Sequence, residues 1–294
     1  MNAAQPFGVE TLGETLAGPV RRPVNFSRDS VGSIHDDATA HRLGFRGGTV
    51  AGNIHFEQFP PLLEAAFGPE WARTGGLSLY FLNATTDGEP VRAFVGPRQE
   101  VASGLRRAEA WMLDAEDRRV CEGTASVGGP DPQSALRQRL AVARPATDLR
   151  MLAGSAVGDA VKDVATRLDG ETAVLRLRGI TEPMAAYGYA KIHGEVVAAP
   201  AIAIDALRAV EGPLFRTDGP FVGMFGAIEL QFLDGPVFVD HDYLADGRVV
   251  ALGESPKTEA VWYESTLKDA ADGRPVARLL MMSRLLKASS PLWS

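Results

Sequence analysis

Two stretches of the sequence decide the fold: FRGGTVAGN at residues 45–53 and IHGEVVAAP at residues 192–200. They lie half a chain apart, and a shift of 147 residues places Gly47 on Gly194. Two more pairs of phrases recur in the same order, namely TTDGEPVRAFV (85–95) with FLDGPVFVDHDY (232–243), and DAEDRRV (114–120) with DAADGRPV (269–276). The sequence therefore indicates an internal duplication, in which each copy forms one structural unit.

Each copy reads as a helix followed by strands. The helices are expected at 50–67, with a break at Pro60 and Pro61, and at 197–210. Strands are expected at 77–86, 90–96, 105–113 and 119–127, and again at 227–233, 237–244, 248–254, 259–267 and 276–286. The dipeptides Asp87-Gly88, Asp246-Gly247 and Asp272-Gly273 are typical of hairpin turns between strands. This pattern predicts an α+β fold in which each helix is wrapped by an antiparallel sheet.

The segment between the two copies differs from both in composition. It is rich in proline and small or polar residues, and a short helix is expected at 134–142. We therefore predict an N-terminal half at 1–130, a linker at 131–150 and a C-terminal half at 151–294.

Composition excludes several classes of protein. A net charge of -7 without a basic stripe argues against a nucleic-acid partner. The first residues do not resemble a signal peptide and no apolar run reaches the ~20 residues that span a bilayer, so a cytoplasmic protein without membrane contact is expected. The single cysteine, Cys121, and the scattered histidines predict no disulfide and no metal site. No glycine-rich motif for a redox cofactor is present.

One segment carries a specific resemblance: NFSRDSVGSIHDDATAHRLGFRGGTVAGN, residues 25–53. It resembles the MaoC-like enoyl-CoA hydratases and dehydratases, whose signature runs Asp-x-Asn-Pro-Leu/Ile-His, then a short helix and a glycine-rich turn. Ile34-His35 matches the end of that signature, residues 40–45 match the short helix and its turn, and Gly47, Gly48 and Gly52 match the glycine-rich entry into the long helix. The resemblance implies a double hot-dog fold, with two long helices each wrapped by an antiparallel sheet as a pseudo-dimer within one chain.

The resemblance also implies a chemistry, which is addition or removal of water at an acyl-CoA thioester. His35 would be the acid-base residue and the Gly52 N–H an oxyanion donor. The position of the family's catalytic aspartate is occupied by Ser30, so Asp29 or Asp36 would have to substitute for it. The CoA thioester would be the substrate, with no other cofactor, and the sequence leaves open whether chains associate into a homo-oligomer.

Two other functions fit the same sequence. Hot-dog thioesterases also resemble the helix at 50–67, and there His55 or Glu57 would direct water at the thioester carbonyl. The displaced aspartate also fits a protein that binds acyl thioesters without catalysis. Acidic residues before a short helix can instead be N-caps, a role that suits Asp37. Tyr187, Tyr189 and His193 form either a packed turn or part of the same cavity.

Overall fold

The computed structural model describes residues 8–182, 184, 187, 191–192 and 194–294. The first half contains the strands β1 (Glu10–Leu12), β2 (Thr15–Ala17), β3 (Gly76–Phe81), β4 (Val91–Val95), β5 (Gln99–Ala102), β6 (Leu105–Asp114) and β7 (Arg119–Val127), and the helices α1 (Asp37–Arg42), α2 (Gly52–Phe56), α3 (Pro60–Phe67) and α4 (Trp71–Thr74). The helix break expected at Pro60 and Pro61 is confirmed, because α3 begins there.

The second half repeats the order of a helix and then a meander of strands. Its strands are β8 (Ala160–Arg167), β9 (Lys191–Ile192), β10 (Glu195–Val196), β11 (Gly223–Phe232), β12 (Asp242–Glu254), β13 (Thr258–Asp269) and β14 (Pro275–Leu286). Its helices are α6 (Gly170–Leu177), α7 (Pro200–Leu207) with the 3₁₀ turn Arg208–Val210, and α8 (Glu211–Leu214). Two further 3₁₀ turns, Lys287–Ser289 and Pro291–Trp293, end the chain.

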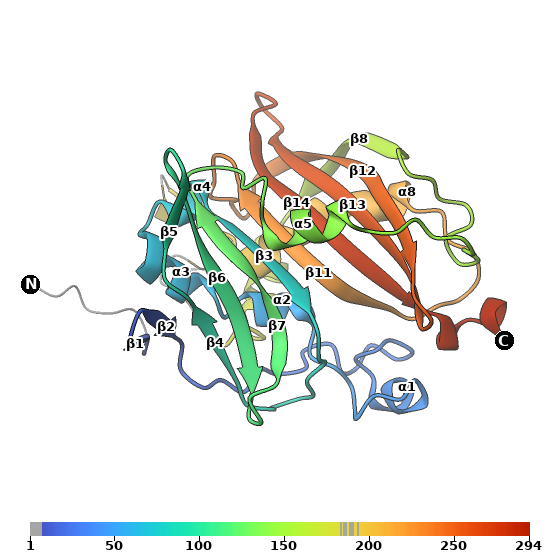
Figure 1. The fold of residues 1–294 in the computed structure, drawn as a ribbon. Helices are drawn as coiled ribbons and strands as arrows, with labels where there is room; N and C mark the ends of the chain where they lie inside the picture. Colours follow the sequence, from blue (N-terminus) through green and yellow to red (C-terminus); the bar gives the residue numbers. More distant parts are fainter. Residues whose placement is uncertain (1–7, 183, 185–186, 188–190, 193) are drawn as a thin grey trace, which may run out of the picture.

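A single antiparallel sheet runs through both halves (Figure 1). Its strand order is β1-β2-β4-β6-β7-β3-β11-β14-β13-β12-β8, with β5 paired on β6. The halves meet where β3 pairs with β11, in a register that places Ser78 opposite Glu229. α2 packs against α7 beside this junction. The two central helices therefore lie side by side within the curve of the shared sheet.

Several details of the expected strand pattern are wrong. The strand expected at 77–86 ends at Phe81, and Asp87-Gly88 joins no hairpin, because β3 pairs with β7 and β11 whereas β4 pairs with β2 and β6. Residues 237–241 precede β12 instead of forming a strand, and Asp246-Gly247 lies inside β12 instead of making a turn. A Cβ on Gly247 would lie 2.8 Å from the Cβ of Val210. This glycine therefore allows the turn after α7 to pack on the sheet, and its role is close packing.

The structure also corrects the register of the internal repeat. The backbone N–H of Val50 donates to Thr85, and the equivalent bond runs from Ala198 to Val237. Val50 is thus equivalent to Ala198 and not to Val197, and the Asp-Gly match at Asp234 is not a structural one. The last pair of phrases does correspond, because β6 and β13 end at their first residues, Asp114 and Asp269.

The segment between the halves is anchored to the sheet by the helix α5 (Ala135–Ala141), which crosses the outer face (Figure 1). Leu136 is fully buried, and the Ser134 hydroxyl donates to Glu229. Arg137 pairs with the same carboxylate at 3.2 Å.

Within the part of the chain that the structure describes, no helix is long and apolar enough to cross a membrane.

His241 ties the β9–β10 hairpin to the sheet and gives a first prediction. Its Nδ1 lies 3.0 Å from Glu195, and its Nε2 lies 2.8 Å from Asp269. Partial burial opposes the charged ring, but the hydrogen bonds to Asp269 and Glu195 outweigh it and raise the pKa of His241 above its usual value. The stabilisation is therefore fully present below the unfolded-state pKa and is lost as the pH rises through the raised one.

We expect His241→Gln to lower the free energy of unfolding by about 1 kcal/mol or less near pH 6, the range of partly exposed ion pairs, and to change it little near pH 9. Urea denaturation at both pH values measures the difference. An equal loss at both would show that the imidazole contributes by packing instead of by charge.

Candidate active site

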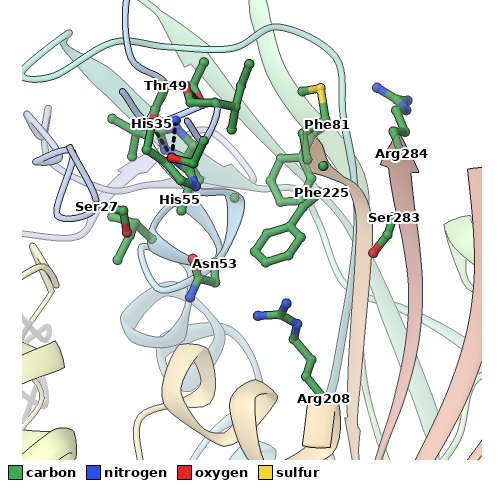
Figure 2. Close-up of a pocket in the computed structure, with 18 of the residues that line it drawn as sticks. Ser27, His35, Thr49, Asn53, His55, Phe81, Arg208, Phe225, Ser283 and Arg284 are labelled. Carbon is green, nitrogen blue, oxygen red and sulfur yellow. Dashed lines mark hydrogen bonds between the residues drawn. The ribbon is translucent and has the colours of Figure 1, made fainter. Parts of the chain in front are cut away.

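A pocket of about 600 Å³ lies at the junction of the two halves. Its first-half wall comes from residues 26–27, 33–35, 49–55 and 81–84, and its second-half wall comes mainly from α7, α8 and the ends of β11 and β14. Figure 2 shows His35, His55 and Asn53 on one side of the pocket, facing Phe225 and Arg284 on the other. Neither half alone could form this pocket.

The loop that carries His35 is fixed by short-range contacts. The Thr49 N–H donates to the carbonyl of the buried Ile34 at 3.0 Å, and the Asn25 amide donates to the His35 carbonyl at 2.8 Å. A Cβ on Gly48 would lie only 2.1 Å from that same His35 oxygen. Only glycine fits at this position, so the glycine-rich turn sets the position of the histidine.

The His35 ring is held in one tautomer. Its Nδ1 lies 2.7 Å from the carbonyl oxygen of Thr49, which can only accept a hydrogen bond. In the neutral ring Nδ1 therefore carries the proton, and Nε2 is left with a free lone pair. Because His35 lines the pocket, this arrangement suits a group that takes a proton from a ligand or a water molecule.

The structure places neither Asp29 nor Asp36 with His35. Asp29 is exposed and does not line the pocket. Asp36 is the N-cap of α1, where it accepts hydrogen bonds from the Thr39 hydroxyl at 2.7 Å and the Ala38 N–H at 3.2 Å. The Thr39 hydrogen bond is the main reason that the pKa of Asp36 is lowered. The proposed substitution of the missing aspartate by either residue therefore finds no support in the geometry.

Asp37, expected to be the N-cap, has a different role. It is the first residue of α1, and its carboxylate accepts a hydrogen bond from the Gly48 N–H at 2.7 Å. It thereby ties the short helix to the loop that positions His35. Of the described residues, the only carboxylates that line the pocket are Asp205 and Glu211, on the second-half side.

Gly52 opens α2 at the pocket. The first N–H groups of a helix have no intrahelical acceptor and carry partial positive charge, so they can stabilise an oxyanion. A Cβ on Gly52 would lie 2.8 Å from the Phe81 ring, which also lines the pocket. The glycine is therefore required by packing, and it leaves the backbone of this turn accessible.

His55 and Asn53 lie on the same helix. Burial lowers the pKa of His55 to about 4, so its ring is neutral at physiological pH. Its Nε2 lies 2.7 Å from the Thr85 hydroxyl. Among the residues the structure describes, neither His55 Nδ1 nor Asn53 Oδ1 finds a hydrogen-bond partner, although both atoms are buried. Both side chains line the pocket, so both can bind a ligand or water there.

Glu57 lies outside the pocket. Its side chain is fully buried at the seam of the halves, and it accepts a hydrogen bond from the Ala201 N–H in the first turn of α7 at 2.7 Å. Burial raises the pKa of Glu57 to about 8 despite this bond, so the carboxyl is mostly protonated at neutral pH. Tyr187 is buried against it, whereas Tyr189 and His193 fall outside the described residues.

Arg208 was not expected from the sequence. It follows α7, stacks 4.7 Å from the centre of the Phe225 ring, and reaches into the pocket opposite α2 (Figure 2). Nothing in its local sequence distinguishes Arg208 from a surface arginine, and only the tertiary fold brings it to the pocket.

The described part of the chain holds no group of three or more side chains that could together bind a metal ion.

The chain resembles known proteins in its three-dimensional structure, whereas its sequence matches none. No family model and no curated protein matches the sequence. A MaoC domain protein of Chloroflexus aurantiacus superposes with a TM-score of 0.59 at 14% identity, over 97% of this chain and 98% of that one. A protein described as a MaoC-like dehydratase gives 0.54 at 15% identity, over 96% and 98% of the two chains.

The description of a third similar structure states its fold. It is a conserved hypothetical protein of Mycobacterium tuberculosis described as having a double hotdog fold, with a TM-score of 0.59, 14% identity, and 94% and 97% of the chains covered. These likenesses confirm the expected α+β double hot-dog fold and, at the level of fold, the resemblance to MaoC-like proteins.

Proposed function

We propose that this protein is an acyl-thioester hydratase or dehydratase with one site per chain. The observation that carries the proposal is the geometry of His35, whose Nδ1 is fixed on the Thr49 carbonyl so that Nε2 can accept a proton in the pocket. The start of α2 lines the same pocket and supplies donors for a thioester oxygen. CoA enters the reaction as part of the thioester substrate, and the proposed reaction uses no other cofactor.

The missing aspartate suggests a mechanism with one acid-base residue. As water attacks Cβ of the enoyl thioester, His35 Nε2 takes a proton from it and the double-bond electrons move to the thioester oxygen. The N–H groups at Gly52 stabilise this enolate. The imidazolium then returns its proton to Cα, which regenerates the neutral ring and completes a net addition of water. Dehydration is the reverse.

Asn53 is suited to hold the attacking water. Its Oδ1 is buried and has no partner within the described residues, and the side chain lines the pocket near His55 (Figure 2). An oxygen in this position can accept one water proton while His35 accepts the other. The amide would thus orient the water, which is a task that the family's aspartate shares.

A thioesterase remains the second candidate because of one observation. His55 Nδ1 is buried, unpartnered in the described structure, and on a pocket-lining residue, so it could direct water at the thioester carbonyl. Glu57, the other candidate for this role, does not line the pocket. A binder without turnover is the third outcome that an experiment must separate.

Mass spectrometry of purified protein with enoyl-, 3-hydroxyacyl- and saturated acyl-CoAs separates the three. We expect a gain of one water on enoyl substrates and a loss of one water on hydroxyacyl substrates, with saturated thioesters unchanged. Free CoA with free acid would indicate the thioesterase, and binding without any change in mass would indicate the binder. Asp29→Asn is the matched control, and it should behave as the wild type because this carboxylate is exposed.

A further inference from the structure

We propose that Arg208 determines specificity by binding an oxygen acceptor at the far end of the acyl group, such as a carboxylate or a hydroxyl. This inference rests on the proposed function, because it assigns the acyl part of the substrate to the second-half side of the pocket. It would make the protein selective for oxygen-bearing acyl thioesters over plain alkyl ones.

The position of Arg208 supports this assignment. The residues of the proposed reaction centre come from the first half, whereas Arg208 enters the pocket from the second half beneath Phe225 (Figure 2). Leu152, Phe215, Val261 and Leu285, all apolar, line the pocket on this side as well. A guanidinium among apolar walls can be satisfied by a ligand oxygen but gains nothing from an alkyl chain.

The hydrogen bonds of Arg208 leave part of the guanidinium free. Its Nε and Nη2 donate to the two oxygens of Glu211 at 2.9 and 2.8 Å. Its Nη1 makes only a longer ion-pair contact, at 3.6 Å, with Asp205, which is itself paired with Arg176. The Arg208 side chain keeps 27% of its surface exposed, and it lines the pocket. Glu211 therefore orients the guanidinium, and Nη1, whose contact with Asp205 is the longest of the three, is the nitrogen that a ligand oxygen can reach.

The charges of the pocket favour an acceptor with negative character. Arg176, Arg208 and Arg284 line it, against the carboxylates Asp205 and Glu211. Glu211 is also satisfied by the Tyr263 hydroxyl, which donates to it at 2.6 Å. Arg176 pairs with Asp205 and Arg208 pairs with Glu211, so both carboxylates are neutralised and a ligand oxygen would not meet net repulsion beside Arg208.

The test compares saturated acyl-CoAs, which bind without hydration. Calorimetry with succinyl-CoA against butyryl-CoA, and adipoyl-CoA against hexanoyl-CoA, measures the preference for a terminal carboxylate at matched chain length, and the terminally hydroxylated analogues test the neutral acceptor. We expect at least one oxygen-bearing ligand to bind about 10-fold or more tightly than its alkyl partner, the range of one charge-assisted hydrogen bond. A preference below about threefold for all of them would overturn the inference.

Variants connect the preference to Arg208. Arg208→Met combined with Glu211→Gln, which avoids leaving a half-buried carboxylate without its arginine, should abolish the preference, whereas Glu211→Gln alone should retain it. Arg284→Met, which removes the pocket arginine that donates to the Tyr80 hydroxyl, should change the affinity of both ligands of a pair by the same factor. If the double variant does not fold, Arg208→Lys should reduce the preference without removing it.

The outcomes also separate this inference from the proposed function. Selective binding without any hydration of enoyl thioesters would retain the role of Arg208 and overturn the hydratase. Hydration without selectivity would do the opposite. Failure of every thioester to bind would overturn both.

Discussion

Replacing His35 with alanine is expected to lower the rate of enoyl-thioester hydration by about 10²-fold or more, the usual scale for loss of a general acid or base. His35 would handle both protons of the reaction, because no carboxylate of the described first half lines the pocket. The loss should fall on kcat, with KM changing little, since the imidazole acts on the reacting atoms and the rest of the pocket still binds the ligand.

His35→Gln makes this result specific. The glutamine amide can still hydrogen-bond with the Thr49 carbonyl but cannot carry a proton between two atoms, so it should be as inactive as the alanine variant. Asp36→Asn is the structural control, because asparagine is also a good N-cap and the rate should be kept. Steady-state kinetics of the three variants measure kcat and KM for hydration. Near-normal turnover by His35→Gln would move the acid-base role to another residue.

The sequence predicted those parts of the fold that depend on neighbouring residues. The hairpin from β13 to β14 at Asp272-Gly273 and the break at Pro60 follow from local turn chemistry and from the missing N–H of proline, and both were found. Asp246-Gly247 has the same local signature as a turn, yet β12 runs straight through it. The deciding contact, with Val210, comes from a helix far away in the sequence. Local patterns cannot contain such information.

Of the candidate site, too, only the part that depends on local sequence could be predicted. His35 stands out because a local motif carries it, and the contacts of Gly48 explain why that motif needs glycine. The flanking carboxylates were misleading, since a residue two positions before a helical N–H can cap it as readily as it can catalyse, and Asp36 does so. Arg208 and Asn53 have no local signature. Both become candidates only when the fold shows which polar side chains line the pocket.

Glu57→Gln is expected to stabilise the protein, and increasingly so as the pH rises. Burial raises the pKa of Glu57 to about 8 from its ordinary value of 4.5. Between these values the unfolded chain has released the proton and the folded chain has not, so the wild type loses about 1.4 kcal/mol of unfolding free energy per pH unit from this group. Glutamine keeps an oxygen for the Ala201 N–H and does not ionise.

The variant should therefore match the wild type near pH 4.5 and exceed it by a few kcal/mol near pH 8, above which the difference becomes constant. Urea denaturation across this pH range measures the two curves. Parallel curves would mean that the Glu57 carboxyl is solvated or ionised in the folded protein, contrary to its complete burial.

The same variant also tests the version of the thioesterase that uses Glu57, because such an enzyme would lose its turnover when the carboxyl becomes an amide. In the hydratase proposed here, Glu57 lies outside the pocket and contacts α7, so hydration should stay within a few-fold of the wild type. A gain in stability together with unchanged hydration would identify Glu57 as a neutral hydrogen-bonding group at the seam of the two halves. Loss of turnover without a change in stability would instead require its carboxylate to reach the thioester, and the assignment of the reaction to His35 would then fail.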